Sequence, residues 1–256
     1  MRNLFGKLIL ACLLLSGCRT NYHLTGQTAQ RLEVNQTVAT DSSLSQMLQP
    51  YRQRLDQTMN EVLVQSAVRL DKAKPESALN NLLADALLIQ ARQRTGQAID
   101  LSHLNYGGIR NSLPQGPIRV SHIFEVMPFD NKITILTLNG PGLLQFLNHF
   151  ISREAGERVL IIGGARVVAN ASGIESIAFS DGRTFQASAL QPAQTFKVAL
   201  SDYIAEGGDD AFFLKNAQKR EDTGFLIREA FIDYFRQLGK SGQPINPTID
   251  GRITRN

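Results

Sequence analysis

Apolar residues recur at three- and four-residue steps in several stretches of the chain, which is the spacing of one face of an α-helix. The first stretch follows Asp41-Ser42-Ser43, which offers an N-cap, and continues to Val62 with Pro50 inside it as a potential break or kink. A second stretch opens at Pro75-Glu76-Ser77 and is stopped by Gly96. Further helices are expected over residues 121–127, 141–152 and 223–237.

Shorter apolar runs predict strands between these helices. Because strands and helices alternate along the chain, we expect one α+β (mixed α/β) domain over residues 42–256, with a multi-stranded sheet and covering helices. The expected strands cover residues 62–70, 98–104, 132–138, 159–169, 174–179 and 196–200, and residues 249–253 are expected to form a closing strand and turn.

The first residues follow a different pattern, in which Arg2 and Lys7 precede a short apolar run. This is the layout of a secretory signal, and the run is too short to span a bilayer. It ends in Leu15-Ser16-Gly17-Cys18, which resembles the bacterial lipobox, where cleavage before the cysteine leaves a thiol that carries diacylglycerol. The alternative is an ordinary leader that contains a cysteine.

We therefore expect a signal peptide over residues 1–17, lipidation at Cys18 and a polar tether over residues 18–41. The protein would then be a membrane-anchored lipoprotein of the bacterial cell envelope, facing the periplasm or the cell surface. Removal of the leader would leave Cys18 as the only cysteine, which excludes an intrachain disulfide.

Composition and charge exclude several kinds of function. The net charge is only +4 and the basic residues are scattered, so a nucleic-acid-binding face is not indicated. No G-x-S-x-G turn, P-loop or G-x-G-x-x-G phosphate cradle is present. The histidines have no second histidine at ligand spacing, so each is expected to be structural or on the surface and not to bind metal; they are His23, His103, His122 and His149.

Segments of glycine and polar residues that fall between predicted elements are the candidate binding loops. The first runs from Asn105 to Ser112, where Gly107 and Gly108 allow positive φ and close backbone approach. Arg110 then presents a planar fork of donors suited to an anionic oxygen. The alternative is a turn with a surface arginine.

The second candidate loop runs from Val126 to Asn131, between a predicted helix and a predicted strand. The ring of Phe129 can stack on a nucleobase while Asn131 hydrogen-bonds to the edge of the base. The alternative places Phe129 in the core. The third loop, Ser201 to Phe212, contains the turn Gly207-Gly208.

In that third loop the carboxylate of Asp209 suits the two hydroxyls of a ribose, and Tyr203 offers a second flat face.

These segments together resemble the C-terminal domain of the 5′-nucleotidase family. The family pattern runs E-S-x-L-G-N-L-x-A-D-A, N-G-G-G-I-R, P-F-x-N, Y/F-x-x-x-G-G-D-G-F and G-R-I. Here the first segment is Glu76 to Ala86, the next three are the candidate loops, and the last is Gly251-Arg252-Ile253, with order and spacing in agreement over residues 60–256.

The resemblance implies a role for each loop residue. Phe129 and Tyr203 would sandwich the nucleobase, Asn131 would bind its edge, and Asp209 would hold the ribose. Arg110 would contact phosphate, and the paired glycines Gly107, Gly108, Gly207 and Gly208 would line the same substrate site.

The sequence departs from the family pattern at several positions. Tyr106, Asn80 and Asp210 stand where the family has glycine, so the local loop geometry is expected to differ. Arg69, Lys72 and Lys74 stand in the stretch before the first segment, where the family places arginines. A lysine offers a point charge in place of a fork, which would weaken bidentate recognition of phosphate.

The largest departure concerns catalysis. Full-length family members carry a metallophosphatase domain with D-x-H, G-N-H-D and G-H-x-H motifs, and these 256 residues contain none of them. We therefore expect no catalytic residue, metal or cofactor in this chain, and a nucleotide-recognition role beside a separately encoded metallophosphatase. The alternatives are a surface lipoprotein that binds nucleosides or nucleotides without hydrolysis, or a scaffold that binds no ligand.

Overall fold

The computed structural model describes residues 29–33, 35, 38–151 and 158–256. The predicted signal peptide, Cys18 and much of the predicted tether, including His23, lie outside the described residues. The chain divides into two units, residues 1–49 and 50–256.

Helix α2 (Ser42–Met59) begins at the predicted N-cap. The carboxylate of Asp41 accepts hydrogen bonds from the backbone N–H groups of Ser43 (2.9 Å) and Leu44 (3.1 Å). The helix continues through Pro50, so the potential break does not occur. Among the described residues, no helix is both long enough and apolar enough to cross a membrane.

A five-stranded sheet, in the order β10-β4-β9-β2-β5, forms the centre of residues 50–256. β9 and β2 are parallel, and the other neighbours are antiparallel. Alternate residues of β4 enter two different cores: Ile135 lies in one and Leu136 in the other. The strands are β2 (Leu101–His103), β4 (Lys132–Asn139), β5 (Ile162–Gly163), β9 (Thr195–Ser201) and β10 (Lys219–Leu226).

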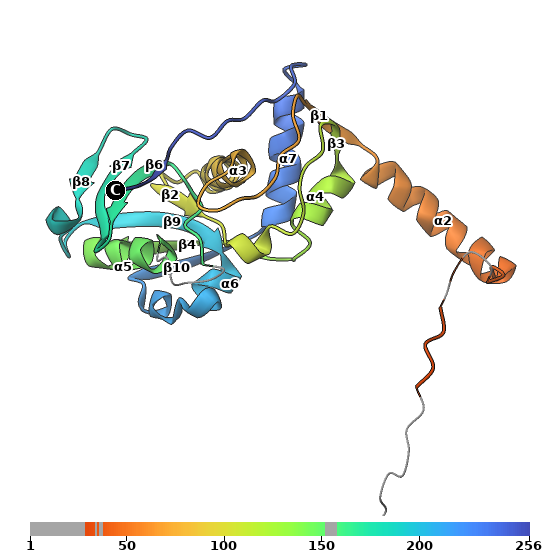
Figure 1. Cartoon of the computed structure of the whole chain (residues 1–256), viewed down its shortest axis with the longest axis horizontal. Helices are drawn as coiled ribbons and strands as arrows, with labels where there is room; N and C mark the ends of the chain where they lie inside the picture. Colours follow the sequence, from red (N-terminus) through yellow and green to blue (C-terminus); the bar gives the residue numbers. More distant parts are fainter. Residues whose placement is uncertain (1–28, 34, 36–37, 152–157) are drawn as a thin grey trace, which may run out of the picture. The chain divides into compact units, whose positions relative to one another are not determined.

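Helices cover both faces of this sheet (Figure 1). α3 (Ala78–Thr95) and α7 (Ile227–Gly239) contribute to the core that contains Ile135, and α5 (Gly140–Ile151) contributes to the core that contains Leu136. The helix α3 begins directly after the predicted opening segment Pro75-Glu76-Ser77, and Ser77 caps it by accepting a hydrogen bond from the Asn80 N–H (3.1 Å). The shorter helices are α4 (Val120–Val126) and α6 (Asp202–Ala205).

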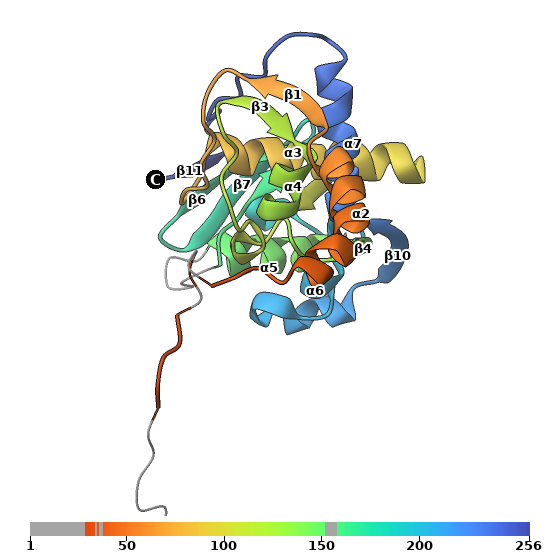
Figure 2. The same cartoon turned by 90° about the vertical axis from the view of Figure 1, so that its right-hand side faces the viewer.

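Two smaller sheets flank the central one. β1 (Val62–Ser66) pairs with β3 (Gly116–Arg119), and α7 packs against β1 (Figure 2). The second small sheet has the order β11-β6-β7-β8, in which β11 runs parallel to β6. Its strands are β6 (Ala165–Asn170), β7 (Gly173–Phe179), β8 (Thr184–Gln186) and β11 (Ile253–Arg255). The predicted mixed α/β fold is thus confirmed.

Several predicted boundaries were wrong. The strand expected over residues 159–169 is divided between two sheets at Gly164, whose φ is 85° and whose missing Cβ would lie 2.5 Å from the Leu88 side chain. The helix expected over residues 223–237 begins only at Ile227, because residues 219–226 form the edge strand β10. The strand expected over residues 62–70 ends at Ser66, whose hydroxyl donates to the Val68 carbonyl (2.7 Å).

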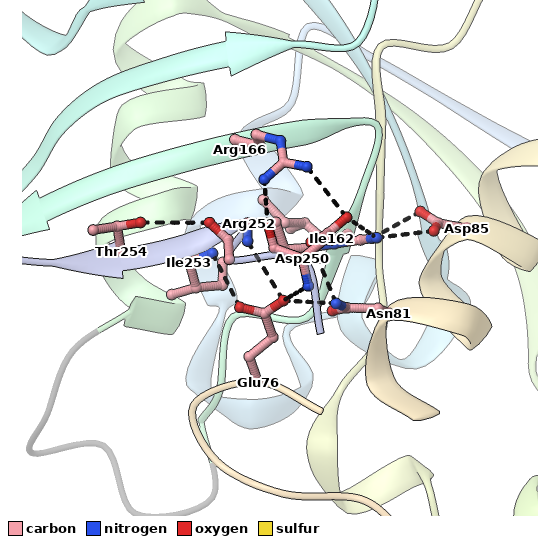
Figure 3. A network of polar contacts seen from close by, with 10 residues as sticks. Glu76, Asn81, Asp85, Ile162, Arg166, Asp250, Arg252, Ile253 and Thr254 are labelled. Atoms are coloured by element: carbon pink, nitrogen blue, oxygen red, sulfur yellow. Dashed lines mark hydrogen bonds and ion pairs between the residues drawn. The ribbon is translucent and has the colours of Figure 1, made fainter. Parts of the chain in front are cut away.

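A polar network around the buried Arg252, here called the Arg252 network, ties α3 and the segment before it to the C-terminal strand β11 (Figure 3). The Arg252 guanidinium donates to both oxygens of Asp85 (2.8 and 3.0 Å) and both oxygens of Asp250 (3.0 and 2.9 Å). It also donates to the backbone carbonyl of Ile162 (2.9 Å). Although desolvation lowers the pKa of Arg252, hydrogen bonds to Asp85 and Asp250 raise it above its ordinary value overall.

Glu76 completes the Arg252 network from the other side. Its carboxylate accepts a hydrogen bond from the Asn81 amide (2.6 Å) and the backbone N–H groups of Asp250, Arg252 and Ile253 (3.3–3.4 Å). The E-S-x-L and G-R-I segments therefore meet in space, and they join α3 to the end of the chain.

Candidate functional site

The first candidate loop follows β2 directly. Tyr106–Gly108 form one turn of 3-10 helix, which has negative φ, so the positive φ expected to be allowed at Gly107 and Gly108 is not used. Close packing explains the second glycine, because a Cβ on Gly108 would lie 2.7 Å from the Asn105 side chain. Arg110 donates to the Gly107 carbonyl (3.1 Å), and its guanidinium lies 5.9 Å from the ring centroid of Phe129.

Two lysines, Lys72 and Lys74, contact this first loop. The Lys72 ammonium donates to the backbone carbonyls of Ile109 (2.7 Å) and Tyr106 (3.3 Å). It lies 4.3 Å from the centroid of the Tyr106 ring, and the Lys74 ammonium lies 4.7 Å from the same centroid. The Tyr106 ring thus packs against both lysines.

The second loop joins α4 to β4. Its Phe129 is 43% exposed, so the alternative that placed this ring in the core is wrong. Arg228, at the start of α7, fixes the loop by donating to the Phe129 carbonyl (3.3 Å) and to the Asp130 carboxylate. The Ile227 N–H donates to the Asn131 carbonyl (2.9 Å), which holds the loop at a second point.

The third loop begins where the Ser201 hydroxyl caps α6. Tyr203, on this helix, is 44% exposed and donates its hydroxyl to the Asp209 carboxylate (3.0 Å). The same hydroxyl accepts a hydrogen bond from the Asp209 N–H (3.3 Å). Desolvation, followed by the hydrogen bond to Asp209, raises the pKa of Tyr203.

The backbone of this third loop is left-handed at three positions. Gly207 has a φ of 99°, while Asp209 and Asp210 have φ values of 52° and 62°. Asp210 therefore adopts the left-handed conformation that a glycine at this position takes easily, and aspartate is among the few residues that tolerate it. Gly208 must be small, because its Cβ would lie 2.5 Å from the Tyr203 ring.

The three loops meet around one pocket, here called the loop pocket, of about 320 Å³. This volume lies within the range of small-molecule sites. Gly207 and Gly208 do not line it, and they act instead by bringing Tyr203 and Asp209 together. The lining residues are Asn105, Gly107, Gly108, Arg110, Phe129, Asn131, Tyr203 and Asp209.

Two residues of this region were missed from the sequence. Asn105 lines the loop pocket and is 8% exposed, and its position as the first residue of the first loop was the only available signal. Arg228 anchors the second loop from a helix that lies far away in the sequence, so no local pattern could have revealed it.

Divalent metal ions, which the resemblance places in a metallophosphatase domain, do not fit the residues described here. Within residues 29–33, 35, 38–151 and 158–256, no three carboxylate, imidazole or thiol side chains come together as a metal site. The loop pocket contributes a single carboxylate, that of Asp209, and its remaining polar groups are amides, a phenol and a guanidinium.

The fold and the pocket define a mixed α/β domain in which three loops at one sheet line a pocket. Comparison with known proteins identifies it further: the family described as 5′-nucleotidase, C-terminal domain, matches residues 56–216. The chain therefore belongs to this family, as the sequence motifs indicated.

Several relatives share this region. The trifunctional nucleotide phosphoesterase protein YfkN of Bacillus subtilis is 26% identical over 233 residues, which cover 87% of this chain and 16% of that protein. A 5′-nucleotidase of Diplobatis ommata is 25% identical over 246 residues, covering 86% and 41%. The crystal structure of a 5′-nucleotidase precursor from Thermus thermophilus matches with a TM-score of 0.68 and 30% identity, covering 82% and 42%. The chain thus spans less than half the length of these relatives.

Proposed function

We propose that this chain is the nucleotide- or nucleoside-recognition domain of a 5′-nucleotidase-type hydrolase that acts in nucleotide catabolism. The observation that carries the proposal is the convergence of three separate loops on the loop pocket, which collects two exposed aromatic rings, an amide, a carboxylate and a guanidinium. These are the groups needed to bind a base, a sugar and a phosphate.

Each group has a role in the proposal. Phe129 and Tyr203 stack on the two faces of the base, and each stack contributes about 1–3 kcal/mol. Asn131 hydrogen-bonds to the base edge, and Asp209 accepts hydrogen bonds from the ribose hydroxyls. Arg110 pairs with a phosphate oxygen after exchanging its bond to the Gly107 carbonyl for the ligand.

Hydrolysis belongs to a second protein in this proposal. Metal ions supply the hydroxide and the charge stabilisation for phosphoester cleavage, and these 256 residues contain none of the D-x-H, G-N-H-D or G-H-x-H motifs. We therefore assign the metals to a separately encoded metallophosphatase, which this chain supplies with bound nucleotide. No nucleic-acid partner is part of the proposal.

A lipid anchor at Cys18 would place this chain at a bacterial envelope membrane. Mass spectrometry of the protein extracted from membranes tests this point. A diacylglyceryl modification at Cys18, absent from a Cys18→Ala variant that becomes extractable without detergent, is expected. An unmodified cysteine in a membrane-bound protein would contradict the anchor.

Calorimetry with adenosine and AMP tests recognition. We expect Phe129→Ala and Tyr203→Ala each to weaken binding by about 10- to 100-fold. Phe225→Ala is the matched control, because Phe225 is similarly exposed (37%) but does not line the loop pocket, and its affinity should stay within about twofold of the unmodified protein. Absence of binding by the unmodified protein would leave only the scaffold alternative.

Phosphate release from AMP tests whether this chain increases the rate of a separate metallophosphatase. The purified chain is mixed with a metallophosphatase from the same envelope compartment, and we expect faster release than from that partner alone. Phe129→Ala should abolish the gain while leaving the partner's own rate unchanged. Binding without any gain in rate would favour a surface nucleotide-binding protein that has no hydrolase partner.

A further inference from the structure

Asp209 occupies a backbone conformation that must be held in place by its surroundings. It has a φ of 52° and is followed by Asp210 at 62°, and two successive left-handed residues other than glycine are uncommon. The loop pocket depends on this conformation, because the direction of the Asp209 carboxylate follows from the backbone at its own residue.

His149 contacts this turn from outside the loop pocket. It lies in the last turn of α5, and its Nε2 atom is 2.9 Å from the backbone carbonyl oxygen of Asp209. A carbonyl only accepts hydrogen bonds, so Nε2 must carry the proton and donate it. The bond crosses from a core helix to the third loop.

The His149 ring is itself fixed by packing. It makes edge contacts with Phe150, with centroids 4.8 Å apart and planes at 85°, and with Phe213, with centroids 5.3 Å apart and planes at 66°. Phe150 is fully buried in the core beneath α5, and Phe213 follows the turn in sequence. The imidazole therefore has little freedom to follow the turn if the turn moves.

Asp209 is thus held on two sides. His149 binds its carbonyl oxygen, while the Tyr203 hydroxyl binds its N–H and its carboxylate. The Tyr203 contact comes from a half-exposed ring of the loop pocket, and the His149 contact comes from a partly buried ring on α5 that packs against the buried Phe150.

We propose that His149 is a positioning residue for the sugar-binding carboxylate: its bond to the Asp209 carbonyl sets the turn that aims this carboxylate at the ribose hydroxyls. The inference rests on the proposed nucleoside-binding function of the loop pocket. His149 does not line the pocket, so it acts through Asp209 and not on the ligand.

Four variants in the otherwise unchanged chain separate the hydrogen bond from the packing. His149→Phe keeps an aromatic ring and loses the donor. His149→Gln places an amide N–H near the position of Nε2, and His149→Asn carries the same amide on a side chain that is too short to reach. Asp209→Ala marks the effect of removing the carboxylate altogether.

Calorimetry with adenosine and with 2′,3′-dideoxyadenosine provides the readout. We expect His149→Phe and His149→Asn to weaken adenosine binding by about fivefold, which is the loss of one hydrogen bond. His149→Gln should stay within about twofold of the unmodified protein, and dideoxyadenosine binding should change by less than about twofold in every His149 variant. A general packing defect would weaken both ligands equally.

Two results would overturn the inference while the proposed function stands: adenosine affinity unchanged in His149→Phe, or an equal loss for both ligands. If His149→Phe does not fold, the pair His149→Gln and His149→Asn decides, since equal affinities in these two variants also overturn the inference. Failure of the unmodified protein to bind adenosine would instead overturn the proposed function, and the inference with it.

Discussion

The Arg252 network and the loop pocket are built from the same kinds of side chain and use them in opposite ways. In the network, Arg252 is 7% exposed and both of its carboxylate partners are hydrogen-bonded to it through two oxygens. In the pocket, Arg110 makes one bond to a neighbouring carbonyl, and two large aromatic rings remain nearly half exposed. The polar groups of the network are bonded to one another and stabilise the fold, whereas Arg110 and the exposed rings are available to the proposed ligand.

The two regions also differ in what the sequence motifs mean. The E-S-x-L and G-R-I segments enter the Arg252 network, whereas the three central motifs form the loop pocket. A shared family pattern therefore combines residues that maintain the fold with residues proposed to bind the ligand, and only the contacts separate the two groups.

The largest expected effect is on stability. Arg252→Ala leaves the Asp85 and Asp250 carboxylates without their main partner, and we expect the free energy of unfolding to fall by about 3 kcal/mol. That value is at the low end for a broken buried pair, because these carboxylates are 37% and 35% exposed. Urea denaturation measures it.

The control for that measurement is Arg166→Ala. Arg166 also pairs with Asp250 but is 58% exposed, so its removal should cost less than about 1 kcal/mol. Equal losses in the two variants would show that burial does not distinguish the Arg252 network from an ordinary surface ion pair.

A second prediction concerns a buried group that belongs to neither region. His103 is fully buried in β2, where desolvation lowers its pKa to about 3, below the ordinary 6.5. Below pH 6.5, His103 is protonated in the unfolded chain but stays neutral in the folded chain. The free energy of unfolding therefore decreases as the pH falls. The free energy of unfolding should drop by about 1.4 kcal/mol per pH unit between roughly pH 6 and pH 4.5.

Urea denaturation at pH 7, 6 and 5 measures this slope. His103→Asn retains a donor for the Ile161 carbonyl, which His103 Nδ1 contacts at 3.1 Å, and it should flatten the pH dependence. Asp250 contributes in a different window: hydrogen bonds from Arg252 lower its pKa, so its contribution is lost only below about pH 4. An unchanged slope in His103→Asn would refute the assignment.

A third prediction separates the sugar from the base inside the loop pocket. Asp209→Ala should weaken adenosine binding by about tenfold, because a hydrogen bond to a charged group is lost. The same change should affect 2′,3′-dideoxyadenosine, which has no hydroxyls for Asp209, by less than about twofold. Equal effects on the two nucleosides, measured by calorimetry, would exclude Asp209 as the sugar ligand.

The smallest expected effect comes from Tyr203→Phe. The ring that stacks on the base remains, while the hydroxyl that holds the Asp209 carboxylate is lost. We expect adenosine binding to weaken by about two- to fivefold, well short of the effect of Tyr203→Ala. If the two variants lose affinity equally, the hydroxyl and not the ring is the main contribution of Tyr203.

The sequence was sufficient for elements whose signals are local. The opening of α3 after Pro75-Glu76-Ser77 and its stop at Gly96 were predicted because these signals act within the first and last turns of the helix. The strand β10 was missed because it lies at a sheet edge, where charged residues such as Arg220 and Glu221 leave no apolar alternation. Its pairing with β4 is a long-range property.

The candidate site shows the same limit. The loops were found because glycines and polar residues interrupt the chain between predicted elements, and their convergence was inferred from resemblance to a family. Arg228 and His149 support loops from which they are far apart in the sequence. Residue spacing within a motif therefore could not indicate either contact.

The edge strand β10 also bears on how the protein behaves at high concentration. Exposed strand edges can pair with the edges of other molecules and so begin aggregation. Here Lys219 and Glu221 form one ion pair along the edge, and Arg220 and Asp222 form another. Pairing with a strand of another molecule would displace these charges and remove their hydration. The charged edge of the sheet therefore opposes aggregation.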